Sequence, residues 1–358
     1  TPCGTLFPYT TLFRSLNREE IKSIAVIGDN ATREHHSGGG SSAIKALYEI
    51  SPLEGLKNKV GDRIQINYAK GYSSEEGIDV RQLYLDALET ARQSDHVIFC
   101  GGLSHKQDTE GQDKPDLKLP YGQAELIQAL LEINPSTIIV LVAGSPVEME
   151  PWIKKAQAVV LAWYPGMEGG TALADILFGD VNPSGKLPCT FPRKLADSPA
   201  HALDAYPGKD GMVEYKEGIY IGYRYFDTFG VNPLFHFGHG LSYTTFDYSD
   251  LKIIKKDVHS FSVTLKIKNS GAFAGKEVVQ LYVIDSKSSV ERPLKELGAF
   301  SKVSLDQGQT KNVQFDLDKS AFSFYDEEQE DWIVEPGEFE ILIGSSSADI
   351  RLAKKIQL

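Results

Sequence analysis

Five short runs of strand-forming residues constrain the fold of this chain most strongly. They span residues 24–28, 64–68, 96–100, 137–142 and 158–162, and the last two are almost entirely aliphatic. Apolar residues at helical spacing fill segments between them, at 52–59, 80–94 and 123–133, with a short helix expected to end near Ala156. Because uniformly aliphatic strands suit a sheet that is covered on both faces, the pattern predicts a doubly wound, mostly parallel α/β domain.

The sequence pattern changes after Trp163. One more helix is expected over residues 169–178, and residues 179–248 are then dense in Gly, Pro and aromatic residues, which indicates an extended connection. Beyond about Tyr248 the pattern predicts strands only, at 261–267, 277–283, 311–317 and 337–343. Alternating strands with turn residues between them are typical of a small β-sandwich of about 100 residues.

The length of 358 residues leaves room for two or three domains. We expect an α/β sandwich domain at 16–190, an extended connection packed on it at 191–247, and an all-β domain at 248–358. Residues 1–15 have no helical or strand period and resemble translated adaptor sequence, so we exclude them as a non-native tail; a flexible native terminus is the alternative. The natural protein is then expected to continue upstream of Leu16.

Composition excludes several partner classes. The formal net charge is −12, from 37 Lys and Arg against 49 Asp and Glu, so we expect no nucleic-acid partner. No stretch approaches the roughly 20 apolar residues of a membrane helix, so no membrane partner is expected either. The three cysteines are widely spaced and form neither a disulfide framework nor a CxxC site.

Two common motifs fail in detail. Gly28 follows a strand, and residues 37–42 are rich in Gly and Ser, but neither segment has the remaining glycines of a dinucleotide site or the lysine of a phosphate-binding loop. Residues 143–147 do not satisfy the G-x-S-x-G pattern of serine hydrolases. We therefore expect no cofactor, and we interpret the glycines as a conformational device that also permits close approach of a ligand.

A polar loop follows the strand at 96–100. Ligand chemistry gathers at the carboxyl ends of strands in an open α/β sheet, and this loop holds Glu110 directly before Gly111, with Asp113 and Lys114 as neighbours that set its charge environment. Composition alone also fits a solvated surface loop.

The histidines and the aromatic residues near the sheet give weaker signals. His35, His36 and His105 lack the spacing of metal ligands, so no metal is expected. Trp163 and Tyr164 end a strand, where they form either a sugar platform or a packed domain interface; the sequence leaves both open.

Several stretches together resemble the C-terminal part of glycoside hydrolase family 3, the β-glucosidase and β-xylosidase group. They are IAVIG (24–28), GGGSS (38–42), SPLEGL (51–56), TEGQDK (109–114), LKLP (117–120), WYPG (163–166), EGG (168–170), NPSGKLP (182–188), YIGYRYFD (220–227) and PLFHFGHGLSYT (233–244).

The resemblance implies an (α/β)6 sandwich followed by a fibronectin type III-like domain. It also implies a barrel domain upstream, which carries the aspartate nucleophile. In the family motif Glu-Gly-x-Asp-Arg, Glu110 matches the acid/base glutamate and Asp113 the aspartate, whereas Lys114 replaces the arginine and its planar bidentate contact. His105, Asp113 and Lys114 are accordingly expected to bind the substrate.

The function implied is that of a retaining β-glycosidase, a β-glucosidase in the first instance, acting on β-linked oligosaccharides or glucosides. As an acid near neutral pH, Glu110 needs a raised pKa, through desolvation or the charge of the nucleophile. Without the upstream barrel this chain is expected to be inactive. The alternative is a non-catalytic carbohydrate-binding or scaffolding protein. Periplasmic or extracellular localisation is an expectation from the class alone.

Overall fold

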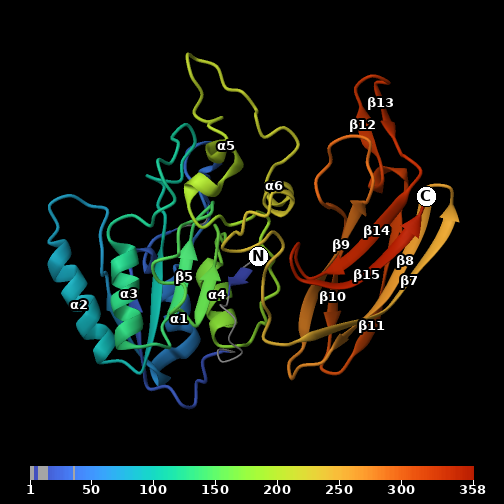
Figure 1. The fold of residues 1–358 in the computed structure, drawn as a ribbon. Helices are drawn as coiled ribbons and strands as arrows, with labels where there is room; N and C mark the ends of the chain where they lie inside the picture. The colour runs from blue at the N-terminus through green and yellow to red at the C-terminus, as the bar shows by residue number, and fades with distance from the viewer. Residues whose placement is uncertain (1–3, 7–14, 35–36) are drawn as a thin grey trace. The chain divides into compact units, whose positions relative to one another are not determined.

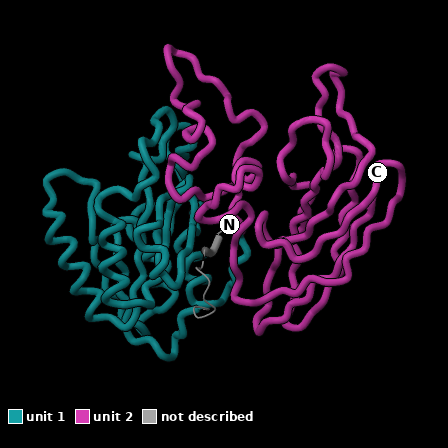
Figure 2. Tube along the Cα trace, in the orientation of Figure 1, with its two compact units in different colours: residues 1–185 teal, residues 186–358 magenta. Residues whose placement is uncertain are grey.

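The computed structural model describes residues 4–6, 15–34 and 37–358, and the chain divides into two compact units, residues 1–185 and 186–358 (Figure 2).

A six-stranded sheet with strand order β1-β6-β5-β4-β2-β3 forms the centre of the first unit (Figure 1). Strands β2 to β6 pair in parallel, and β1 pairs with β6 in the antiparallel sense. The prediction of a doubly wound, mostly parallel sheet is therefore confirmed. The strands are β1 (Gly4–Leu6), β2 (Ser23–Ile27), β3 (Gln65–Ala69), β4 (His96–Gly102), β5 (Ile138–Val142) and β6 (Ala158–Leu161).

Helices cover both faces of this sheet, which is why β5 and β6 are aliphatic throughout. Every residue of β5 and β6 is buried. Helix α1 packs against α4 and helix α2 against α3, and the two pairs lie on opposite faces, as right-handed crossovers in opposite directions require. The helices are α1 (Pro52–Val60), α2 (Val80–Arg92), α3 (Gln123–Ile133) and α4 (Gly169–Leu177), with 3₁₀ turns at Asp29–Ala31, Gly40–Ser42 and Gly61–Arg63.

Two glycines set the distance between α1 and α4. A Cβ atom on Gly55 would lie 2.2 Å from the carbonyl group of Gly170, and one on Gly170 would lie 2.1 Å from the carbonyl oxygen of Ser51. Ser51 also caps α1, because its side chain accepts a hydrogen bond from the backbone amide of Glu54. The helices therefore approach backbone to backbone, which no larger residue at these positions permits.

Two expectations for the first unit differ from the structure. The segment before Ala156 forms successive turns, with the amide of Trp152 donating to Met149, instead of a helix. The backbone hydrogen bonds there mostly join residues three apart, as from Lys155 to Trp152 and from Ala156 to Ile153, instead of the four apart of an α-helix. Residues 4–6 pair with β6 although the sequence there has no strand period. Residues 1–3 and 7–14 lie outside the described residues, and the foreign origin of the tail stays a prediction.

The second unit is built of antiparallel sheets, which confirms the all-β prediction. One sheet has the order β10-β9-β14-β15, a second has β11-β8-β7, and β12 pairs with β13. The strands are β7 (Phe246–Asp257), β8 (Ser260–Asn269), β9 (Gly275–Asp285), β10 (Glu296–Leu305), β11 (Thr310–Leu317), β12 (Phe324–Asp326), β13 (Asp331–Ile333), β14 (Glu338–Gly344) and β15 (Ile350–Gln357). Their inward residues form one apolar core, which includes Val263, Leu281, Phe339 and Ile341.

The segment expected as a connection, residues 191–247, lies within the second unit, residues 186–358. It contains the short helices α5 (Pro199–Ala202) and α6 (Tyr223–Thr228) and a 3₁₀ turn at Leu195–Asp197. The carbonyl of Gly238 accepts from Gln280 on β9, and the Tyr223 hydroxyl accepts from the amide of Leu297 on β10. The connection therefore packs on the β-sheets, and its expected packing on the α/β domain stays a prediction.

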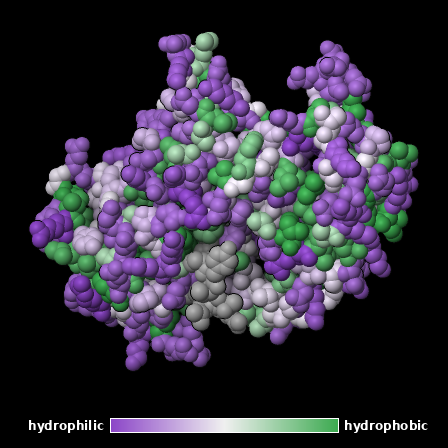
Figure 3. Space-filling model, viewed as in Figure 1, coloured by the Kyte–Doolittle hydropathy of each residue, from purple (hydrophilic) through white to green (hydrophobic). Residues whose placement is uncertain are grey.

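Hydrophilic side chains cover most of the described surface on the face drawn in Figure 3, and apolar residues gather only in small groups. Across the described residues, no helix is both long and apolar enough to cross a membrane.

Candidate active site

The order of the strands places a switch point between β2 and β4. From β2 the chain crosses to β3 on one side, and β4, β5 and β6 follow on the other. Ligands in open α/β sheets bind outside the carboxyl ends of the strands at such a point. Gly28 directly follows β2 here, and its backbone lies so close to β4 that an added Cβ would be 1.9 Å from the carbonyl oxygen of Cys100.

Buried polar residues line the switch point. The Asn30 side chain donates to the carbonyl of Leu103 at 3.1 Å and accepts from the Tyr72 hydroxyl at 2.7 Å. The Arg33 guanidinium donates to the carboxylate of Asp29 at 2.8 Å. Asn30 therefore ties the loop after β2 to the loop after β4 and to the segment after β3. None of these residues was predicted from the sequence, although a polar Asp-Asn pair directly after a buried strand was an available signal.

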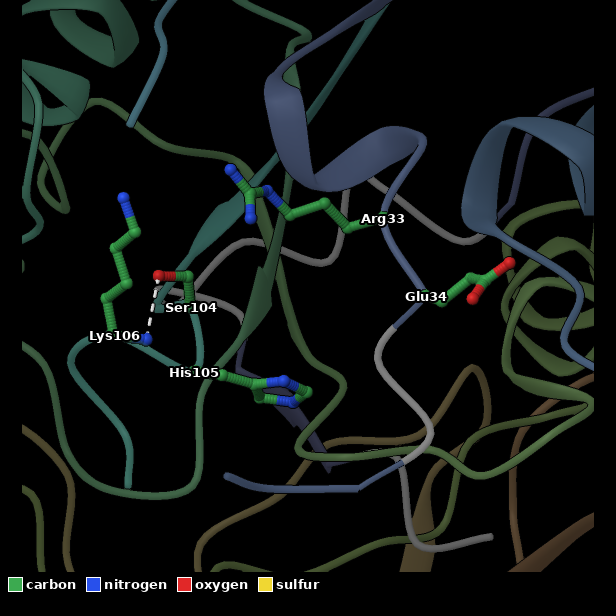
Figure 4. Close-up of a pocket in the computed structure, with 5 residues that line it drawn as sticks. All are labelled: Arg33, Glu34, Ser104, His105 and Lys106. Carbon is green, nitrogen blue, oxygen red and sulfur yellow. Dashed lines mark hydrogen bonds between the residues drawn. The ribbon is translucent and has the colours of Figure 1, made fainter. Parts of the chain in front are cut away.

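A hollow of about 230 Å³ lies beside this point, lined by Arg33, Glu34, Ser104, His105 and Lys106 (Figure 4). The Glu34 carboxylate points away from the other four side chains. The ring Nε2 of His105 lies 2.7 Å from the carbonyl oxygen of Ser37. His105 is thus placed at the predicted edge of the sheet, and its contact with a substrate stays a prediction.

Glu110 lies in the loop after β4, exposed to solvent. The backbone amide of Ser41 donates to its Oε2 at 3.1 Å. Gly40, at a φ of +69°, allows this approach, because an added Cβ would lie 2.6 Å from the Cβ of Glu110. The glycine run, interpreted from the sequence as permitting close approach of a ligand, here accommodates the loop that carries Glu110.

The pKa of Glu110 is lowered in this structure. The Ser41 hydroxyl is the larger cause and the Ser41 amide the second, because both donate hydrogen bonds to the carboxylate. The raised pKa expected of a general acid is therefore not produced by the groups of this chain.

Lys114 is directed to Asp108. Its Nζ lies 2.6 Å from Asp108 Oδ1 and also donates to the Ser145 hydroxyl. Asp113, the other predicted neighbour of Glu110, has an exposed side chain. Binding of substrate by Asp113 and Lys114 stays a prediction.

Asp108 is the most heavily bonded carboxylate of this loop, and it was not predicted from the sequence. Its Oδ2 accepts from the Tyr164 hydroxyl at 2.6 Å and from the Gly144 amide at 2.6 Å. Burial alone would raise the pKa of Asp108, but the hydrogen bonds from Lys114, Tyr164 and Gly144 outweigh it and lower the pKa. Tyr164, which the sequence left as platform or interface, thus has its hydroxyl engaged within the first unit.

The described part of the chain offers no metal centre. Within it, no group of three or more His, Cys, Asp or Glu side chains is arranged to hold an ion. His35 and His36 lie outside the described residues.

Comparison with family models assigns both halves. Residues 16–223 match the model described as glycosyl hydrolase family 3 C-terminal domain, and residues 277–347 match that of a fibronectin type III-like domain. The first match extends past the boundary expected at residue 190, into the connection.

Individual relatives agree with this assignment. A β-glucosidase of Bacteroides ovatus is 47% identical over 349 residues, covering 93% of this chain and 46% of that protein. The thermostable β-glucosidase B of Acetivibrio thermocellus is 48% identical over 340 residues, covering 94% of this chain and 44% of that protein. The chain therefore spans about half the length of the curated relatives it matches.

Solved structures give the same result. The crystal structure of a β-glucosidase from Kluyveromyces marxianus has a TM-score of 0.92 and 30% sequence identity, covering 99% of this chain and 60% of that one. The sheet order, the family models and these relatives agree, and the chain belongs to glycosyl hydrolase family 3, of which it contains the C-terminal domain and a fibronectin type III-like domain.

Proposed function

We propose that this chain is the C-terminal portion of a retaining β-glucosidase, which hydrolyses terminal non-reducing β-D-glucosyl residues, and that Glu110 is its acid/base group. The position of Glu110 carries the proposal: an exposed carboxylate in the loop that leaves β4, beside the switch point of the sheet. Glucoside is the substrate class because the relatives from Bacteroides ovatus and Acetivibrio thermocellus are named β-glucosidases. Periplasmic or extracellular localisation is part of the same proposal.

Retention of configuration needs two carboxyl groups about 5 to 5.5 Å apart. One attacks the anomeric carbon while the other protonates the leaving oxygen, and the second group then takes a proton from the attacking water. Asp108 is unsuited to be the partner of Glu110, because its oxygens accept from Lys114, Tyr164 and Gly144. We infer that the nucleophile is an aspartate supplied from outside this chain.

The two bonds from Ser41 suit the second half of this cycle. Since they stabilise the carboxylate, they favour the form of Glu110 that accepts a proton from water. The first half requires the protonated form. The negative charge of a nearby nucleophile, and exclusion of water by a bound sugar, both raise a carboxyl pKa. The full protein is therefore expected to reverse the shift that this chain shows.

Replacing Glu110 by Gln in the protein extended by its upstream reading frame tests the assignment. We expect kcat/KM to fall about 100-fold or more for glucosides with poor leaving groups, because their departure needs the proton. Aryl glucosides with strongly activated leaving groups should lose far less. Glu132→Gln, which removes an exposed carboxylate of α3, is the matched control and should change neither value. An equal loss for both substrate types would refute the role of Glu110.

The 358-residue chain by itself should release no nitrophenol from aryl β-glucosides, since one carboxyl cannot perform a double displacement. Steady hydrolysis that survives repeated purification would show that the nucleophile lies within this chain.

Ser41→Ala should raise the pKa of Glu110 toward the ordinary glutamate value of about 4.3, because the hydroxyl that stabilises the carboxylate is lost. Because the pKa of Glu110 is lower in the folded than in the unfolded chain, its carboxylate stabilises the fold at pH values above the unfolded-state pKa. This stabilisation is lost as the pH falls through the folded-state pKa. Titration of the carboxyl carbon by NMR in the 358-residue chain measures the pKa. Ser42→Ala, whose hydroxyl donates to the carbonyl of Gly39, is the control. An unchanged pKa in Ser41→Ala would show that the Ser41 hydroxyl is not the cause of the shift.

A further inference from the structure

Asp108 joins the loop of Glu110 to the ends of two other strands. Its Oδ2 accepts from the amide of Gly144, which follows β5, and from the hydroxyl of Tyr164, which follows β6. Its Oδ1 pairs with Lys114 at 2.6 Å, on the far side of Glu110 in the sequence. The loop is thereby closed on itself and fastened to the sheet through one side chain.

The geometry leaves little freedom at this carboxylate. The side chains of Asp108 and Lys114 are only 14% and 22% exposed, so removing one charge leaves the other partly buried without its partner. Gly144 has no room for a side chain, because an added Cβ would lie 2.8 Å from Asp108 Oδ2 and 2.8 Å from a ring carbon of Tyr164. Charge-assisted hydrogen bonds of this kind are among the stronger ones in proteins and are directional.

Asp108 is also linked to the surroundings of Glu110 through backbone hydrogen bonds. The carbonyl of Asp108 accepts from the amide of Gly39 at 3.1 Å, and the carboxylate of Glu110 accepts from the amide of Ser41 at 3.1 Å. The loop after β2 and the loop after β4 are therefore hydrogen-bonded to each other at two neighbouring points. Only one residue separates Asp108 from Glu110. A shift at Asp108 would therefore displace the carboxyl group of Glu110.

We propose that Asp108 is the positioning residue of the acid/base loop: with Lys114, Tyr164 and Gly144 it holds Glu110 where its proton reaches the leaving oxygen. This inference rests on the function proposed for Glu110. It also gives Lys114 a role different from substrate binding, since its ammonium group serves the carboxylate of Asp108.

Replacing Asp108 by Asn in the full-length protein should lower kcat/KM for poor leaving groups about 10- to 100-fold, because a displacement of the order of 1 Å costs about that much. Activated aryl glucosides should lose less. Tyr164→Phe removes one hydrogen bond and should show a smaller loss with the same dependence on the leaving group. Lys114→Met removes the cation that pairs with Asp108 Oδ1 and should show a loss with the same dependence on the leaving group.

The double variant Asp108→Asn with Glu110→Gln separates positioning from general damage. If Asp108 acts through Glu110, the double variant should be no slower than Glu110→Gln alone on poor leaving groups. Multiplied losses, or an equal loss of Asp108→Asn on both substrate types, would overturn the proposal. Asp175→Asn is the matched control: it alters a partly buried carboxylate that pairs with Lys59 between α1 and α4, and activity should stay within about twofold.

Hydrogen exchange of the 358-residue chain distinguishes failure of this inference from failure of the proposed function. Asp108→Asn should speed the exchange of backbone amides in residues 104–116 and leave β5 and β6 protected. Unchanged exchange in the loop would overturn the positioning role whatever Glu110 does. Faster exchange together with no effect of Glu110→Gln on the reaction would overturn the proposed function and with it the catalytic consequence of positioning.

Discussion

Burial of the middle strands on both faces is the constraint on which the first unit depends. Since β5 and β6 have no exposed residue, polar chemistry is excluded from the body of the sheet and confined to the loops at its edge. The reversal of strand order between β2 and β4 selects one place on that edge. Glu110 and Asp108, from the loop after β4, meet there the glycine-rich segment at 37–42, from the loop after β2.

Two carboxylates of one loop have different surroundings and hence different roles. Asp108 has its oxygens occupied by a cation, a hydroxyl and an amide, which fixes both its charge and its position. Glu110 is exposed and held by Ser41, so its protonation responds to whatever group approaches it. Separation of environments is how neighbouring carboxyl groups acquire separate functions. In the proposed mechanism the Asp108 carboxylate, whose charge and position are fixed, holds the loop of Glu110, whose protonation state changes.

The sequence predicts the elements whose signal is local. Uniform aliphatic runs predict β5 and β6. The polar loop of Glu110 is predicted from its place directly after β4. Strands β10 and β15 were not predicted, because most of their inward residues are only partly buried and some are polar, such as Ser301, so the apolar half of the alternation is weak. Asp108 could not be found in the same way, because its partners Gly144 and Tyr164 lie 36 and 56 residues away and meet it only in the folded sheet.

The most direct test of the central claim is the product formed when Glu110→Ala, in the full-length protein, is assayed with an activated aryl glucoside and azide. Azide attacks the glycosyl-enzyme without needing a base, so it should restore turnover that the loss of Glu110 abolishes. NMR of the product should show the β-glucosyl azide, formed by two inversions. No acceleration by azide, or an azide of α configuration, would contradict the assignment of Glu110 as the acid/base group of a retaining enzyme.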